Sequence, residues 1–582
     1  MSQNRLSRQQ KSTLIIAAVI FVLLCACTII LLLVGRDLWE SLRPVDPDTS
    51  VSPAAELTIA VSPGMAPTFN SLVEQFNAQT NTTPDGSLVL VRTVTMVPEK
   101  MVESSLDRPA FQAVAPDSSL WLNQIDRQWE HLQQALTQNQ DAEGLIPIGN
   151  RRVSEPVRYA TSPIVIAAWE SVAYELGWHE QNISWQDIQR KATENPDFKW
   201  NHPSTGHASG LLATLAEFYA GAGLTRGLTT ETATQQSTLD YVRAVEATVR
   251  FYGEGEDVIL QRLSAEGRSF LDAFVTQEQT VIAWNKTAPA EELVALYPAE
   301  GTLWADHPLA LLELGGAGEQ PLTDNQRRTY QAFADFLTGP GAQQQLLDAG
   351  YRPADLTIAL DQPGSPFAGT DKVDFHQPQT TLQIPSESVV EVVQNVWWYT
   401  KRPTNVYLVV DTSGSMEGDK IELTQMALQS FVEQIRGDRD QVGMIAFSND
   451  AEVLLSLQPL DDAGRASLQS TIQQIYAAGN TALIDGVWEA YTELQLHGDS
   501  EAINAIVVMT DGHENNSAFS MRDLQARLQQ EQTVRVVIFA IAFGSDADEA
   551  LMQDLANMGG GQFRRADETE IEDLYKTIST YF

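Results

Sequence analysis

The last third of the chain contains continuous apolar segments that each end in a polar turn. Residues 406–410 lead into the turn 411–415 (Asp-Thr-Ser-Gly-Ser), and residues 505–509 lead into the turn 510–512 (Thr-Asp-Gly). An unbroken apolar run is typical of a strand that is buried on both faces, as in parallel sheets covered by helices. Turns that follow parallel strands gather at one edge of the sheet. The pattern therefore predicts an α/β domain in which these polar turns meet.

The turn 411–415 carries side chains that suit a metal ion. Asp411, Ser413 and Ser415 present oxygen atoms at alternate positions, and Gly414 lets the backbone turn sharply. One carboxylate and two hydroxyls, without sulfur or imidazole, form a hard-oxygen set. Such a set favours Mg²⁺, with Mn²⁺ or Ca²⁺ as alternatives, over Zn²⁺.

Two later turns add oxygen atoms to this set. Thr481 lies before a predicted helix, and Asp511 follows the apolar segment 505–509. With Asp411, Ser413 and Ser415, they resemble the metal-ion-dependent adhesion site of the von Willebrand factor A domain, and the resemblance covers about 403–582. It implies a doubly wound, mostly parallel sheet.

The resemblance also implies a role for each of these residues. The two serines would bind the ion directly, Thr481 directly or through water, and the two aspartates largely through water. Such an ion stays electrophilic, so an acidic side chain from a partner protein can complete its shell. In the alternative interpretation, Asp411 and Ser415 only cap a turn and a helix. His513 and Glu514 are expected at the rim.

An earlier region, 57–353, alternates short apolar strands with helical patterns. Polar turns follow several strands, at positions where open α/β sheets hold ligands. The segments 159–163, 202–206 and 297–302 resemble those of extracellular solute-binding proteins of the two-lobed, type II periplasmic kind. The resemblance implies one lobe from 57 to about 160, joined by the chain after about 288, and a second lobe between.

In such a fold, hydroxyls at lobe-facing turns would hold a small or anionic solute. The candidates are Ser62, Ser118, Ser162 and Tyr297, although each serine could instead cap a helix. His202 and His207 have no cysteine nearby and no acidic residue at ligand spacing, so we expect surface or packing roles for them. Residues 281–284 (Val-Ile-Ala-Trp) are predicted to be a strand.

The N-terminal region predicts a membrane anchor. Residues 13–34 form 22 uncharged positions, long enough to cross a hydrocarbon core of about 30 Å. Basic residues precede this segment, so the tail 1–12 is expected in the cytoplasm and the domains outside, after a linker at 35–56. Lipid attachment at Cys27 is an alternative, but the apolar run continues for seven residues beyond it.

A second linker is predicted at 354–402. It is rich in Pro and Gly before a helix at 386–399, which begins with the possible cap Ser386. Trp397 and Trp398 in this helix are expected to pack against a domain. The C-terminal domain then occupies 403–582.

Charge and motifs narrow the classes of function. The net charge of −39 argues against nucleic acid as a partner, because phosphate backbones require clustered Lys and Arg. The sequence lacks a P-loop motif and a recognisable Ser–His–acid arrangement, so we expect a binding protein and not an enzyme. The alternative is the solute-binding component of a transport or sensing system.

Overall fold

The computed structural model describes residues 55–138, 151–253, 255–315, 319–437, 439–530, 533–579 and 581–582. The predicted cytoplasmic tail, the anchor at 13–34 and nearly all of the first linker lie outside these ranges. Among the described helices, none combines the length and apolar character that a membrane span requires.

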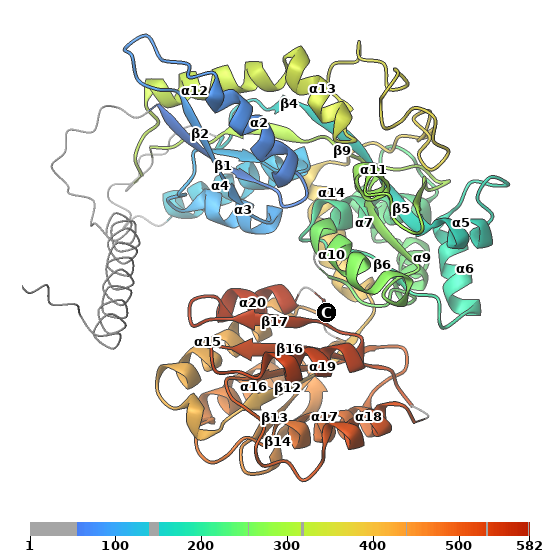
Figure 1. Cartoon of the computed structure of the whole chain (residues 1–582), viewed down its shortest axis with the longest axis vertical. Helices are drawn as coiled ribbons and strands as arrows, with labels where there is room; N and C mark the ends of the chain where they lie inside the picture. Colours follow the sequence, from blue (N-terminus) through green and yellow to red (C-terminus); the bar gives the residue numbers. More distant parts are fainter. Residues whose placement is uncertain are drawn as a thin grey trace, which may run out of the picture. The chain divides into compact units, whose positions relative to one another are not determined.

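Lobe one of the first domain is built on a five-stranded sheet of order β2-β1-β3-β10-β4 (Figure 1). β1 is parallel to β2 and β3, whereas β10 returns antiparallel to β3 and β4. Its elements are β1 (Glu56–Val61), α2 (Ala66–Ala78), β2 (Leu90–Thr95), α3 (Pro98–Leu106), β3 (Ala113–Ala115), α4 (Ser119–Gln138), β4 (Val157–Arg158), β10 (Pro308–Leu311), α12 (Asp324–Leu337) and α13 (Pro340–Asp348).

Lobe two has a second sheet, of order β11-β5-β7-β6, in which β8 and β9 also pair with β5. The long strand β5 is buried at nearly every position, so this sheet is the centre of the lobe. Its elements are β5 (Ala160–Trp169), α5 (Glu170–Leu176), α6 (Trp185–Glu194), β6 (Trp200–Asn201), α7 (Ala208–Ala222), α8 (Thr230–Ala233), α9 (Gln236–Glu246), α10 (Glu256–Glu266), η1 (Gly267–Ser269), β7 (Ala273–Gln277), α11 (Glu278–Lys286), β8 (Leu293–Leu296), β9 (Trp304–Ala305) and β11 (Arg352–Pro353).

The chain crosses between the lobes at Tyr159, at Asp306–His307 and again between α13 and β11. The first two segments run side by side, because β4 pairs with β10 on one side of the crossing and β5 pairs with β9 on the other. The prediction that the second crossing lies near 288 is wrong, since β8 and β9 still belong to lobe two. The sequences of the short strands β8 and β9 do not indicate which of the two sheets each strand joins.

The predicted strand at 281–284 is also wrong. These residues lie in helix α11, whose buried side chains include Thr280, Val281 and Ile282. A short apolar run fits a buried strand and a buried helical turn equally well, so periodicity alone does not separate them.

The segment between the two domains packs on lobe two. Phe367, Val373 and Leu382 are buried, and Thr381 bridges to Thr302. Helix α14 (Glu387–Thr400) then contacts α7, α8 and α9. Trp397 is buried and donates a hydrogen bond from Nε1 to Glu246 Oε1 at 2.6 Å.

The second domain is a six-stranded sheet of order β14-β13-β12-β15-β16-β17. All of its neighbouring strands are parallel except β13 and β14. The predicted fold class, α/β with a two-lobed domain before a doubly wound, mostly parallel sheet, is confirmed. Its elements are β12 (Thr404–Asp411), η2 (Gly414–Met416), α15 (Asp419–Gln434), β13 (Gln441–Phe447), β14 (Ala451–Pro459), α16 (Asp462–Gln474), α17 (Leu483–His497), β15 (Ile503–Thr510), α18 (Met521–Leu528), β16 (Val536–Phe543), α19 (Glu549–Gly559), β17 (Phe563–Ala566) and α20 (Ile571–Ser579).

The second domain contacts lobe two through the edge where its parallel strands begin. The backbone N–H of Arg402 donates to the hydroxyl of Tyr252 at 2.8 Å, and its guanidinium donates to the carbonyl of Val249 at 2.9 Å. β12 is eight residues long, so its far end lies roughly 26 Å from this contact. The turns that follow the strands therefore lie at the edge away from lobe two.

Candidate metal centre and lobe interface

The loop after β12 is organised around the buried carboxylate of Asp411. Its Oδ1 accepts a hydrogen bond of 2.7 Å from the backbone N–H of Ser413, and its Oδ2 accepts one from the hydroxyl of Thr510. Burial raises the pKa of Asp411 to about 6, although these hydrogen bonds oppose the shift. The carboxylate ties the ends of the neighbouring parallel strands β12 and β15 together.

The other four predicted residues lie around this loop. The hydroxyls of Ser413 and Ser415 share a hydrogen bond of 2.9 Å, and Ser415 Oγ donates to Asp511 Oδ1 at 2.6 Å. Thr481 lies beside Gly512, as does Ser415. A β-carbon built on Gly512 would lie 3.4 Å from Ser415 Oγ and 3.8 Å from Thr481 Oγ1, so both hydroxyls border the same glycine. The structure thus brings all five sequence-predicted residues into one cluster, which we call the oxygen cluster.

The chemistry of this cluster suits a hard divalent cation. Three hydroxyls and two carboxylates converge, and their oxygen atoms are the ligands that Mg²⁺ prefers. One cationic side chain that sequence reasoning missed also takes part: Lys420, on α15, pairs its ammonium with Asp511 Oδ2 at 2.5 Å. It lies nine residues beyond Asp411 in a helix, and only the packing of α15 against the loop reveals it.

The two predicted rim residues lie in the loop after Asp511. His513 is exposed, and its Nδ1 lies 3.3 Å from Asp548 Oδ2. Glu514 accepts hydrogen bonds from the N–H of Ile484 at 3.1 Å and from the hydroxyl of Ser517 at 2.7 Å. Glu514 therefore holds its loop against the start of α17.

The two lobes of the first domain meet at polar, buried side chains. The turn after β1 in lobe one lies against the start of α10 in lobe two. A β-carbon built on Gly64 in this turn would lie 3.9 Å from Glu256 Oε2. Tyr351 OH donates to the carbonyl of Gly64 at 3.4 Å. Ser62, in the same turn, is fully buried, and its Oγ has no hydrogen-bond partner among the described residues.

His307, in the second crossing segment, is a residue that sequence reasoning missed. Its φ of +32° is a conformation that non-glycine residues seldom adopt, and such strain concentrates at functional sites. Burial lowers its pKa to about 4. Its Nε2 lies 2.8 Å from Gln277 Oε1, whereas no described residue is a hydrogen-bond partner of its Nδ1.

Two of the other buried hydroxyls without a described hydrogen-bond partner belong to elements beside His307. They are Tyr159 OH, in the first crossing segment, and Thr276 Oγ1, near the end of β7. The rings of Tyr159 and His307 lie 6.4 Å apart. Since buried polar atoms are nearly always hydrogen-bonded, these atoms indicate a place for a bound molecule or for water.

The other three predicted solute residues already have partners. Ser118 Oγ accepts from the N–H of Leu120 at 3.3 Å, and Ser162 Oγ accepts from the N–H of Gln279 at 3.1 Å. Both serines therefore satisfy helix N-termini, of α4 and α11. Tyr297 OH donates to Glu278 Oε1 at 2.5 Å, within an ion pair of Glu278 with Arg352. Among the four predicted residues, Ser62 is the one whose oxygen lacks a described partner.

His202 is buried beside two carboxylates that sequence spacing did not reveal. Ligand atoms of His202, Glu217 and Glu246 lie within 4.8 Å of one another. Both oxygens of Glu246 already accept hydrogen bonds, from Trp397 at 2.6 Å and Tyr252 at 2.8 Å. Burial, with Glu246 and Glu300, raises the pKa of Glu217 well above its ordinary value. A protonated Glu217 accounts for this group without an ion.

Two protein families match separate parts of the chain. Residues 57–352 match the family described as bacterial extracellular solute-binding protein, which is half of the chain. Residues 405–577 match the von Willebrand factor type A domain.

Individual relatives cover only parts of the chain. Inter-alpha-trypsin inhibitor heavy chain H4 from Homo sapiens is 29% identical over 191 residues, which is 31% of this chain and 20% of that protein. Uncharacterized protein YfbK from Escherichia coli is 25% identical over 166 residues, 28% of each chain. Among solved structures, the sulfate-binding protein SubI from Mycobacterium tuberculosis is 17% identical with a TM-score of 0.36, covering 53% of this chain and 89% of that one. This chain therefore spans about a fifth to a quarter of the length of these curated relatives.

Proposed function

The chain belongs to the bacterial extracellular solute-binding protein family and carries a von Willebrand factor type A domain after it, and from this we propose a membrane-anchored, extracytoplasmic binding protein. The type A domain would bind a partner protein in a metal-dependent way. The solute-binding module would bind a small molecule. The predicted anchor at 13–34 would hold both domains outside the membrane.

The oxygen cluster is the observation that supports metal-dependent binding of a partner protein by the type A domain. Ser413, Ser415 and Thr481 would hold Mg²⁺ together with Asp411 and Asp511. Bound there, the ion would supply an open electrophilic position for an acidic side chain of a partner protein. The cluster lies at the edge of the sheet opposite the contact with lobe two, so a partner can approach it without displacing the first domain.

We propose binding at this cluster and not catalysis. Both carboxylates are engaged: Asp411 accepts from Ser413 and Thr510, and Asp511 accepts from Ser415 and Lys420. A general base needs a carboxylate that is free to take a proton from a substrate. Turnover of a substrate by the purified chain that is lost in Asp511→Ala would contradict this proposal.

Titration of the purified chain with Mg²⁺ tests the metal site. We expect saturable heat and a higher melting temperature in the parent, and neither in the double variant Ser413→Ala/Ser415→Ala. The matched control is Ser470→Ala, because Ser470 is an exposed serine on α16 whose loss should leave the Mg²⁺ response unchanged. An unchanged response in the double variant would show that the ion binds elsewhere.

A second function, capture of a small solute, is favoured by the unpartnered atoms between the lobes. Ser62, Tyr159, Thr276 and His307 offer hydroxyl and imidazole groups to a polar molecule. Asp117 and Glu256 lie near enough to raise the pKa of Tyr351, after burial itself. Their carboxylates favour a neutral or cationic solute over the anion that the sequence suggested.

A thermal-shift screen of the full chain with sugars, polyols, amino acids and amines tests this function. We expect one class to raise the melting temperature in the parent but not in Ser62→Ala. If no class shifts the melting temperature, the first domain is a platform that displays the type A domain. A confirmed solute would be compatible with the alternative function, in which the chain delivers that solute to a permease in a transport or sensing system.

A further inference from the structure

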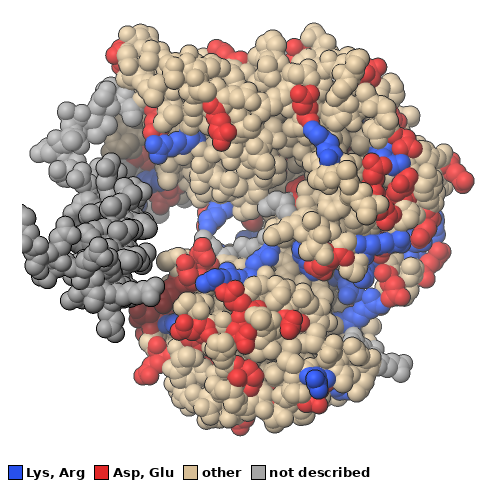
Figure 2. Space-filling view, viewed as in Figure 1, with Lys and Arg blue, Asp and Glu red and all other residues tan. Residues whose placement is uncertain are grey.

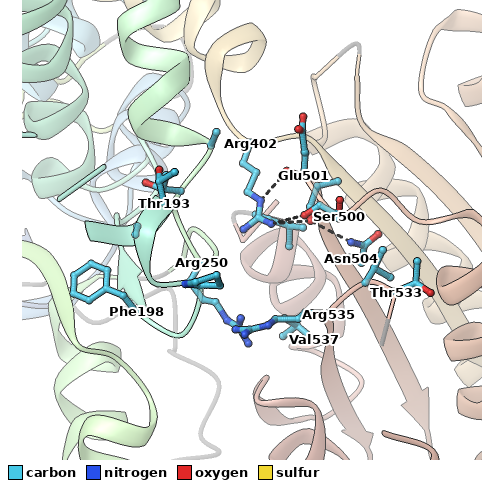
Figure 3. Close-up of a pocket in the computed structure, with 17 residues that line it drawn as sticks. Thr193, Phe198, Arg250, Arg402, Ser500, Glu501, Asn504, Thr533, Arg535 and Val537 are labelled. Carbon is cyan, nitrogen blue, oxygen red and sulfur yellow. Dashed lines mark hydrogen bonds between the residues drawn. The ribbon is translucent and has the colours of Figure 1, made fainter. Parts of the chain in front are cut away.

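A cleft with a volume of about 680 Å³ lies between lobe two and the edge where the strands of the type A domain begin (Figure 3). One wall is formed by the ends of α6 and α9 and the loops after them. The other wall is formed by Arg402 and the starts of β15 and β16. The oxygen cluster and the lobe interface are both separate from this cleft.

Three arginines line this cleft: Arg250 from lobe two, Arg402 from the segment before β12, and Arg535 from the type A domain. Figure 3 shows the side chains of Arg250 and Arg535 pointing toward one another. In the space-filling view, Lys and Arg side chains gather where lobe two meets the second domain (Figure 2). This concentration stands out in a chain with a net charge of −39.

The positive charge in this cleft is only partly compensated. Among the described residues, the guanidinium of Arg402 donates to carbonyl oxygens, those of Val249, Ser500, Glu501 and Ala502. The carboxylates of Asp499 and Glu501 offset part of its charge. Arg535 pairs with Asp197 at 2.7 Å, but 86% of the Asp197 side chain is exposed, so solvent screens that pair.

The guanidinium of Arg250 has no hydrogen bond or ion pair with any residue that the structure describes, whereas its backbone N–H donates to the carbonyl of Trp200 at 3.0 Å. Burial, followed by the nearby Arg535 and Arg402, lowers the pKa of Arg250 to about 10, although Asp197 opposes the shift. Placing like charges together in a half-buried cleft is unfavourable unless an anion neutralises them. Asp197 is a described carboxylate that offsets part of this repulsion, and it already pairs with Arg535.

We propose that this cleft binds a phosphate group, either free phosphate or the phosphate of a small metabolite. The guanidinium fork matches phosphate oxygens in pairs, and the forks of Arg250 and Arg535, one from each wall, can contact one group. Arg402, whose fork is held by carbonyl oxygens, adds positive charge beside them. Thr533 also lines the cleft and adds a hydroxyl donor. Because the arginines come from both domains, the bound anion holds lobe two against the type A domain.

Calorimetric titration of the purified full chain tests the proposal. The ionic strength is held constant, and EDTA removes divalent cations so that metal binding at the oxygen cluster contributes no heat. The probes are inorganic phosphate and pyrophosphate, with chloride as the reference anion. We expect one saturable site in the parent and at least about tenfold weaker binding in Arg250→Gln, since the variant loses charge-assisted hydrogen bonds to the anion. Tighter binding of pyrophosphate indicates a phosphorylated metabolite, and equal binding indicates free phosphate.

The matched control is Arg243→Gln, because Arg243 lies on α9 and pairs with Asp240 outside the cleft. It should bind both probes like the parent. Without anion, Arg250→Gln should melt no lower than the parent, since it removes a repulsive charge. Binding that is absent from the parent overturns the proposal, as does binding of equal strength in Arg250→Gln, which would place the anion elsewhere.

Discussion

The oxygen cluster and the lobe interface both lie where strands end, yet their polar atoms are satisfied in opposite ways. In the oxygen cluster, Ser413, Ser415 and Asp511 are joined by hydrogen bonds of 2.6–2.9 Å, and Lys420 neutralises Asp511. At the lobe interface, Ser62, Tyr159, Thr276 and His307 each bury an atom without a described hydrogen-bond partner.

This difference separates two kinds of binding site. A network of satisfied groups keeps its geometry with or without an occupant, so it can present a fixed set of ligands. Buried atoms without partners cost free energy until a molecule satisfies them, so their site depends on an occupant or on closure of the lobes. In the proposed function, the type A domain would therefore offer a preformed site, whereas binding by the first domain would depend on the state of its lobes.

The largest expected effect concerns the pH dependence of the lobe interface. The folded-state pKa of His307, about 4, lies below its ordinary value of 6.5, so the folded chain binds the proton less readily than the unfolded chain. The stability is therefore full above about pH 6.5 and falls as the pH decreases toward 4. The loss at pH 4 is about 3 kcal/mol.

Denaturant unfolding at pH 7 and pH 4 in the parent and in His307→Asn measures this effect. Asparagine accepts the positive φ and does not titrate. Between pH 7 and pH 4, His307→Asn should therefore lose about 3 kcal/mol less unfolding free energy than the parent. His376→Asn is the control, since His376 is exposed and should leave the parental pH dependence unchanged. The same pH dependence in His307→Asn and the parent would show that His307 is not the residue that responds.

The second effect concerns the preformed network. Asp411→Ala leaves the buried N–H of Ser413 and the hydroxyl of Thr510 without their acceptor. We expect a loss of about 2 kcal/mol of unfolding free energy and of the Mg²⁺ response, measured by denaturant unfolding and calorimetry.

The exposed Asp546 supplies the control, and Asp546→Ala should change neither quantity. Normal Mg²⁺ binding in Asp411→Ala would mean that the network does not need its central carboxylate. The contrast between a preformed site and one that depends on an occupant would then fail.

The smallest effect isolates the role of Lys420. Its ammonium lies beside the carboxylate that would face a cation, so Lys420→Gln should strengthen Mg²⁺ binding by about fivefold, or about 1 kcal/mol. Lys576→Gln changes a lysine that pairs with Glu572 on α20, and it should leave the Kd unchanged. Weaker Mg²⁺ binding in Lys420→Gln would show that Lys420 positions Asp511 and does not compete with the ion.

Local patterns in the sequence were sufficient to predict the oxygen cluster. Residues 406–410 and 505–509 are continuous apolar runs, and parallel strands place their following turns at one edge. The meeting of Asp411 with Asp511 therefore follows from strand direction alone. Lys420 could not be found in this way, because the packing of a helix against a loop leaves no spacing signal.

The lobe interface was less predictable. The hydroxyls of Ser118, Ser162 and Ser62 look alike in sequence, yet two satisfy helix N-termini and the third has no described partner. The strain at His307 and the second crossing at 306–307 depend on pairings between distant strands. The sequence of a strand shows no periodic pattern that identifies its distant partner, so the predicted crossing near 288 was wrong.

Apolar runs, turn residues and the resemblance to the von Willebrand factor A domain were enough to predict two α/β domains and the five-residue cluster, because strand direction places the turns after parallel strands at one edge. Only the tertiary structure brought Arg250, Arg402 and Arg535 to one cleft and buried Glu217 beside His202. Charges far apart in sequence influence one another through space, and burial sets the strength of that interaction. The chemistry of the three arginines therefore appears only when the two domains are in contact, and that of Glu217 and His202 only when lobe two is folded.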